Sequence, residues 1–95
     1  MNGPERRARR FVIAGKVQGV GFRWFTRRAA SDLGVMGQVR NLPDGRVEAE
    51  AAGSREQLDA FRERLRQGPS GSRVTHIEEQ EISPVPDWDG FVIDR

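Results

Sequence analysis

Residues 11–23 read FVIAGKVQGVGFR and place three kinds of local structure in one short stretch. The apolar run Phe11–Ala14 is typical of a buried strand. The segment that follows, Gly15–Gly21, is too rich in glycine to form one regular element. The next apolar side chains recur at helical spacing, which predicts a helix over Phe22–Leu33 with one face against a sheet. Gly34 is well placed to end this helix in a left-handed conformation.

A hairpin should come next along the chain. Gln38–Leu42 and Val47–Ala52 predict two strands around a turn at Pro43–Gly45. In the second of these strands, valine and alanine alternate with Glu48 and Glu50. This alternation predicts one buried face and one wet face.

The last third of the chain predicts a second helix and two strands. Ser54 and Gln57 have the spacing of a capping box. Three apolar residues at helical spacing follow them, and the helix should stop at Gly68–Pro69; the three are Leu58, Phe61 and Leu65. Arg73–Ile82 is typical of an exposed edge strand. Residues 83–90 are irregular because their prolines cannot donate to a strand ladder, and residues 91–93 predict a final short strand.

This order of elements favours an α+β class and the ferredoxin-like βαββαβ two-layer sandwich. We expect an antiparallel sheet with two helices on one face and a short extra C-terminal strand. The third strand should fill the gap that the right-handed crossover leaves between the first two. Residues 1–8 are expected to form a flexible basic arm, and residues 9–95 the single domain that 95 residues can build. Because this fold has many functions, the function has to come from a site.

The composition excludes several kinds of chemistry. The chain has no cysteine and one histidine, His76, which argues against cysteine nucleophiles, histidine triads and multi-histidine metal sites. No apolar run approaches the length of a membrane span, and the N-terminus lacks a hydrophobic signal core, so we expect a cytoplasmic protein. The net charge is +2 and Lys16 is the only lysine. This small positive balance suits an anionic ligand without requiring one.

The segment Gly15–Arg23 is the strongest candidate for a site. It lies between a strand and a helix N-terminus, where free N–H groups meet the positive end of the helix dipole. Its glycines let successive amides converge into an anion nest suited to phosphate. Arg23 can add a two-pronged contact to phosphate oxygens. The segment is neither a Walker loop nor a dinucleotide fingerprint, and the pattern alone leaves a plain structural turn open.

Gly15–Arg23 resembles the first signature of the acylphosphatase family. Gly37–Asn41, reading GQVRN and followed by Gly45, Val47 and Gly53, resembles the second. The two motifs have the order and separation found in that family.

The resemblance covers residues 10–93 and departs from the family at Gln38, where an aromatic residue is usual. This substitution bears on packing beside the second strand. It does not touch the residues to which chemistry is assigned.

The resemblance implies an enzyme that hydrolyses the carboxyl–phosphate anhydride bond of acyl phosphates. Arg23 would bind the phosphate and Asn41 would orient the attacking water. The loop amides would complete the cradle; they belong to Gln18, Gly19, Val20, Gly21, Phe22 and Arg23. The family uses no metal and no cofactor, and an acyl phosphate substrate and inorganic phosphate product are the expected partners. Trp24 and Trp88 are candidates for the acyl pocket, although packing or rim positions suit them as well.

Alternatives from other classes stay open at this point. From its residue type alone, Asn41 could be an ordinary turn residue before the hairpin turn. The fold and the arginine-rich arm allow a nucleic-acid-binding module, although the expected strands lack aromatic stacking positions. A non-catalytic accessory domain that binds acyl or carbamoyl phosphate is the third possibility. We expect a monomer that binds neither membrane nor nucleic acid.

Overall fold

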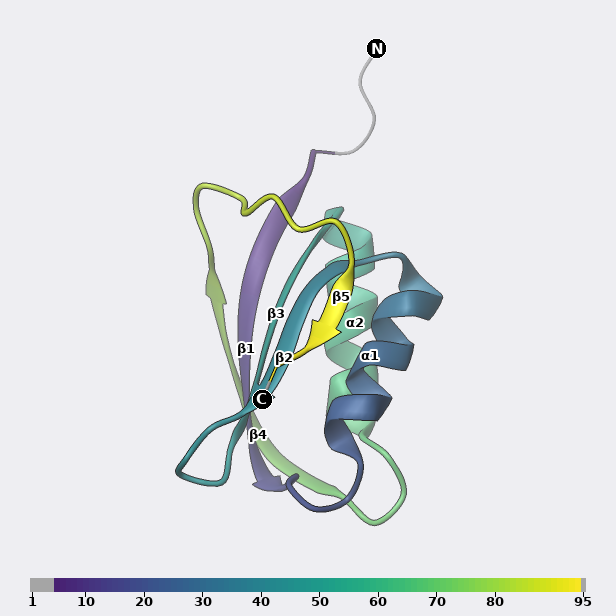
Figure 1. Ribbon diagram of the computed structural model, residues 1–95, viewed down its shortest axis with the longest axis vertical. Coiled ribbons are helices and arrows are strands. Elements are labelled where there is room, and N and C mark those ends of the chain that lie inside the picture. The colour runs from purple at the N-terminus through teal and green to yellow at the C-terminus, as the bar shows by residue number, and fades with distance from the viewer. Residues whose placement is uncertain (1–4, 95) are drawn as a thin grey trace.

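The computed structural model describes residues 5–94 and consists of a five-stranded sheet with two helices on one face (Figure 1). Its elements are β1 (Arg7–Lys16), α1 (Phe22–Leu33), β2 (Met36–Asn41), β3 (Val47–Gly53), α2 (Arg55–Gln67), β4 (Arg73–Glu81) and β5 (Phe91–Ile93). The strand order is β4-β1-β3-β2-β5. The third strand therefore lies between the first two, and the predicted ferredoxin-like sandwich is confirmed.

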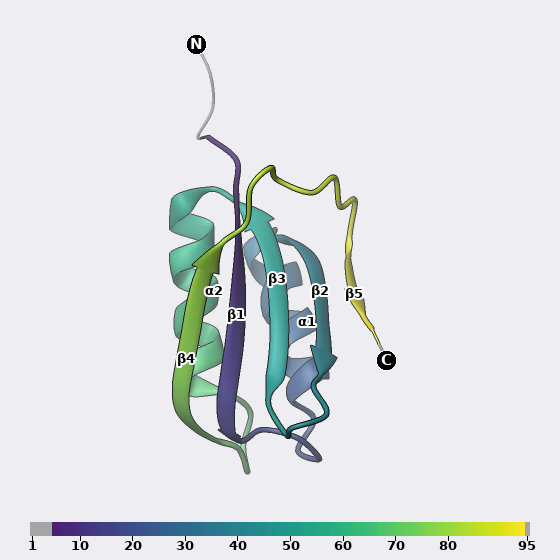
Figure 2. The same cartoon turned by 90° about the vertical axis from the view of Figure 1, so that its left-hand side faces the viewer.

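The short fifth strand makes the sheet mixed. The first four strands pair only antiparallel, as predicted: β3 with β1 and β2, and β4 with β1. In contrast, β5 pairs in parallel with β2. Residues 82–90 cross one end of the sheet from β4 at one edge to β5 at the other, so β5 runs in the same direction as its neighbour β2 (Figure 2). β5 thereby extends the sheet beside α1.

The end of α1 and the start of α2 follow the local signals in the sequence. Gly34 ends α1 in the left-handed region with φ 76°, and its N–H donates to the carbonyl of Ala30. The capping box of α2 is complete: the Ser54 hydroxyl accepts from the N–H of Gln57 at 3.1 Å, and the Gln57 side chain accepts from the N–H of Ser54 at 2.8 Å. These bonds satisfy donors that a helix start leaves free.

The hydrophobic core fills the space between the helices and the sheet. Phe61 on α2 contacts Phe11 on β1 edge to face, with ring centroids 5.7 Å apart, and Phe91 on β5 at 5.9 Å. Leu58 and Leu65 of α2 are also fully buried. Phe91 thus connects the added strand to the core.

Glu48 shows that the prediction of a wet outer face on β3 is wrong at this position. It is only 4% exposed, because β3 is the central strand and long arginine side chains of both neighbours cover it. Arg10 of β1 and Arg40 of β2 each donate a hydrogen bond to its carboxylate. Burial acts to raise the pKa of Glu48, but the hydrogen bonds and charges of the two arginines outweigh it and hold that pKa below its usual value.

The first strand begins earlier than the expected domain boundary at residue 9. β1 starts at Arg7, which pairs with Gly53, and Ala8 is fully buried. The expected arm therefore loses its last two residues to the sheet. Its residues 1–4 lie outside the described residues.

We expect Glu48→Gln to lower the free energy of unfolding by about 1–3 kcal/mol at neutral pH, because both guanidiniums lose their charged acceptor. The folded-state pKa of Glu48 is depressed, so its contribution is present above the unfolded pKa of about 4.3 and is lost as the pH falls through the folded-state pKa. Urea unfolding at neutral pH and near pH 3 measures both effects, with the exposed Glu63→Gln as control. Equal stability of variant and parent at neutral pH would contradict the prediction.

Candidate functional site

β1 and β2 have their C-terminal ends at the same end of the sheet, and these two strand ends position the site. β1 and β2 are both antiparallel to β3 and therefore run in the same direction (Figure 2). β1 ends at Lys16 and leads through residues 17–21 into α1, while β2 ends at Asn41. Asn41 shares the helix-side face of β2 with the buried Val39, because alternate residues of a strand point the same way. This arrangement brings Asn41 to the glycine-rich loop.

The loop turns through two left-handed glycines. Gly19 has φ 75° and Gly21 has φ 78°, whereas no residue other than glycine has a positive φ among residues 5–94. A Cβ atom at either position would meet nothing within 4 Å, so the requirement for glycine here is conformational rather than steric. Alternation with the ordinary conformation of Val20 is the backbone pattern of an anion nest.

The loop and helix start carry a run of free donors. The N-cap of α1, Gly21, provides no side-chain acceptor, and the first turn has no acidic residue. Phe25 is the first residue of α1 whose N–H forms a hydrogen bond, which it donates to the Gly21 carbonyl at 3.0 Å. In the described part of the chain, no backbone N–H between Gln18 and Trp24 donates to a protein acceptor. These donors lie at the positive end of the helix dipole, where an anion is favoured.

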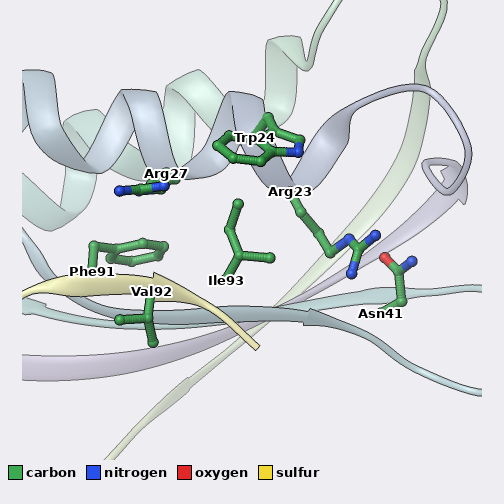
Figure 3. Close-up of a pocket in the computed structure, with 7 residues that line it drawn as sticks. All are labelled: Arg23, Trp24, Arg27, Asn41, Phe91, Val92 and Ile93. Atoms are coloured by element: carbon green, nitrogen blue, oxygen red, sulfur yellow. The ribbon is translucent and has the colours of Figure 1, made fainter. Parts of the chain in front are cut away.

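Arg23 and Asn41 meet at this loop. Together with Gly19, Gly21 and Phe22 they line a cavity of about 80 Å³. Figure 3 shows the guanidinium of Arg23 and the amide of Asn41 pointing toward one another.

The charge of Arg23 is not balanced by a carboxylate within residues 5–94. A cation in the first turn of a helix lies next to the positive end of the dipole, which is unfavourable unless an anion joins it.

Gln18 and Val20, which were also predicted to belong to the phosphate cradle, do not line this cavity. The Gln18 amide instead donates to the carbonyl of Leu42 at 2.8 Å and to that of Arg46 at 3.0 Å. Leu42 and Arg46 are themselves bonded across the hairpin turn. The Gln18 side chain therefore fastens the glycine loop to the turn that follows Asn41. Val20 packs against the core.

A wider pocket of about 660 Å³ opens from the Arg23–Asn41 pair (Figure 3). Four of its lining residues were not predicted from the sequence; they are Arg27, Phe91, Val92 and Ile93. Arg27 could have been found from its spacing of four residues from Arg23 on one helix. The residues of β5 could not, because their position depends on parallel pairing with β2. Trp24 lies at the rim and is 66% exposed, while Trp88 does not line the pocket.

The remaining candidates add no second site. His76 is exposed on β4, and no group of three or more His, Asp or Glu suited to a metal occurs within residues 5–94. In the same residues, neither helix is both long and apolar enough to span a bilayer. Gln38, the residue that departs from the family pattern, lies away from the site and donates to Glu50 across the sheet at 2.8 Å.

Nearly the whole chain is similar to known proteins, and the sequence and structure comparisons agree on the family. The sequence model described as Acylphosphatase matches residues 9–93. An acylphosphatase of Actinobacillus succinogenes is 48% identical over 87 residues, which is 92% of this chain and 97% of the relative. One of Acaryochloris marina is 54% identical over 72 residues, or 76% and 77% of the two chains. The crystal structure of acylphosphatase from Bacillus subtilis superposes with a TM-score of 0.91 at 36% identity, covering 94% of this chain and 99% of that one.

Because Gln18 fastens the loop, we expect Gln18→Ala to lower the free energy of unfolding by about 1–2 kcal/mol. The affinity for inorganic phosphate should also fall about three- to tenfold, since the freed loop has to be ordered when the anion binds. Urea unfolding and a phosphate titration followed by NMR measure the two effects.

Gln38→Ala is the matched control, because it removes a side-chain hydrogen bond from the opposite face of the sheet. Its phosphate affinity should stay within about twofold of the parent. If the two variants bound phosphate equally well, Gln18 would have no role in shaping the loop.

Proposed function

Since this chain belongs to the acylphosphatase family, whose members hydrolyse the carboxyl–phosphate anhydride bond, we propose that Arg23 and the loop amides hold the phosphate while Asn41 positions the water. The enzyme is thus a hydrolase of acyl phosphates. The proposal concerns which residues carry out the reaction and how. The observation that carries it is the cavity in which Arg23 and Asn41 face the donors of the glycine loop.

The phosphate is held by charge and by fixed donors. The backbone N–H groups of residues 18–23 donate to no protein acceptor within residues 5–94, and Gly19, Gly21 and Arg23 line the small cavity. The guanidinium of Arg23 has no carboxylate partner among the described residues. Negative charge spreads over the three equatorial oxygens during phosphoryl transfer. Donors that are already oriented stabilise this charge without reorganisation.

Asn41 contributes position rather than basicity. Its amide can both accept and donate hydrogen bonds, so it can hold a water in line with the bond to be broken. The water oxygen forms the new bond to phosphorus as the bond from phosphorus to the acyl oxygen breaks. The water proton passes to phosphate or solvent, and the bonding electrons leave with the carboxylate.

The leaving group explains why the site works without a general acid. The conjugate acid of the departing carboxylate has a pKa of about 4, like a free aspartic or glutamic acid. It therefore leaves as the anion at neutral pH, and no histidine or cysteine is required to protonate it.

The open face of the sheet does not support the nucleic-acid alternative. The two Phe, Tyr or Trp side chains in the described strands, Phe11 and Phe91, both pack into the core and present no ring for base stacking. On that face Arg10 and Arg40 are engaged by Glu48. Phosphate binding at the loop remains the function that the geometry favours.

We also propose a monomer that acts in the cytoplasm. The two large apolar side chains exposed among residues 5–94, Trp24 and Val92, both belong to the wide pocket rather than to a separate apolar face. This supports the monomer. The cytoplasmic location is carried over from the sequence as a prediction.

We expect the purified protein to hydrolyse benzoyl phosphate in the presence of EDTA, with inorganic phosphate as a competitive inhibitor. Arg23→Ala should raise KM and also slow turnover, because the same guanidinium binds the ground state and the transition state. Asn41→Ala should lower kcat at least about a hundredfold with a smaller effect on KM. Steady-state kinetics with an acyl phosphate, beside a phosphate ester that should not react, measure these effects.

Arg28→Ala is the matched control, since Arg28 is an exposed arginine of the same helix that lines neither cavity of the site. Its kinetics should equal those of the parent. Full activity of Arg23→Ala and Asn41→Ala would contradict the roles proposed for these two residues. Activity that EDTA abolishes and Mg²⁺ restores would refute the mechanism, and phosphate binding without turnover would favour the accessory-domain alternative.

A further inference from the structure

The wide pocket extends well beyond the place proposed for the phosphate. Arg23 and Asn41 occupy one end, and Arg27 lies at the other (Figure 3). Ile93 lies between the two ends in the same view. An acyl phosphate bound through its phosphate would therefore direct its acyl chain over Ile93 toward Arg27.

Arg27 is the second cation that lines the wide pocket. It forms no ion pair with a carboxylate in the part of the chain described here, and none of the residues lining the wide pocket is acidic. Asp32, which lies on the same helix, is engaged by Arg64 at 3.1 Å. The pocket thus contains two guanidiniums and presents a positive potential to whatever enters it.

The guanidinium of Arg27 is held in place by an aromatic ring. Its Cζ atom lies 5.6 Å from the ring centroid of Trp24, which is a cation–π contact. Arg27 and Phe91 line the same end of the wide pocket (Figure 3). The contact with Trp24 restricts the guanidinium without neutralising it, so its N–H groups remain able to bind an anion.

The spacing of the two arginines limits the length of the ligand. Residues four apart on a helix are separated by about 6 Å along its axis. The stretch between them is apolar, since Phe91 and Ile93 are partly buried side chains packed against the core. Along the pocket, a positive charge, an apolar surface and a second positive charge follow one another. A short methylene chain with an anionic group at each end is complementary to this arrangement.

We propose that Arg27 determines specificity by binding a second carboxylate, so that the preferred substrates are monoacyl phosphates of short dicarboxylic acids. This inference rests on the proposed function, because it assumes that the phosphate binds at Arg23 and Asn41. The acyl phosphates of monocarboxylic acids use the same site but leave Arg27 without a partner.

Succinyl phosphate and butyryl phosphate test the proposal directly. They have the same chain length and differ in a terminal carboxylate against a methyl group. The parent enzyme should have a kcat/KM about three- to tenfold higher for succinyl phosphate, as expected for one partly exposed charge pair. The difference should appear in KM, and it should diminish at high salt.

Arg27→Gln should bring the succinyl-to-butyryl ratio of kcat/KM close to one, because the second carboxylate loses its cationic partner. Arg27→Lys keeps the charge and should restore part of the preference. Arg28→Gln, a neighbouring arginine outside the wide pocket, should keep the parental ratio.

A parental ratio at or below one, or a preference that survives Arg27→Gln, would overturn the inference. Butyryl phosphate separates this failure from a failure of the proposed function. If butyryl phosphate is hydrolysed in a reaction that depends on Arg23 and Asn41 while the ratio is one, the role of Arg27 alone is refuted. If neither compound is hydrolysed, both proposals fall.

Discussion

The contact on which the site depends is the pair of hydrogen bonds from the Gln18 amide to the carbonyls of Leu42 and Arg46. β1 and β2 are not neighbours in the sheet, since β3 lies between them. Because β1 and β2 run in the same direction, the glycine loop and Asn41 lie at the same end of the sheet. This direction does not by itself fix the distance between the loop and Asn41. The Gln18 side chain spans that gap and joins the loop to the hairpin turn. The proposed phosphate cradle and the residue proposed to orient water are thereby joined at one end of the sheet.

The arginines of this chain separate into two groups according to whether a carboxylate engages them. Arg9 pairs with Asp59 and Glu79 at 2.8 Å each. These pairs join β1 to α2 and to β4, and they are structural. Arg23 and Arg27 have no such partner among residues 5–94 and both line the wide pocket. Because an unpaired cation in a pocket favours an anion there, the absence of protein partners points to a ligand.

The sequence predicted those features whose causes are local. The start and end of α1, the capping box of Ser54 and the hairpin turn all depend on residues close together in the chain. The same holds for the glycine loop and for Arg23 at the helix start. The burial of Glu48 was not predictable in this way, because the arginines that cover it come from two other strands. The position of Arg27 in the pocket likewise depends on β5, whose pairing with β2 joins residues far apart in sequence.

The central claim is that the backbone amides of the loop and the helix start bind a phosphate oxyanion, and titration of ¹⁵N-labelled protein with inorganic phosphate tests it most directly. We expect saturable shifts concentrated at the amides of residues 18–24, with a smaller response at the Asn41 side chain. An equal titration with chloride at matched ionic strength should leave these signals in place. Amides of residues 18–24 that do not respond to phosphate, or a response no larger than that of the rest of the chain, would contradict the account.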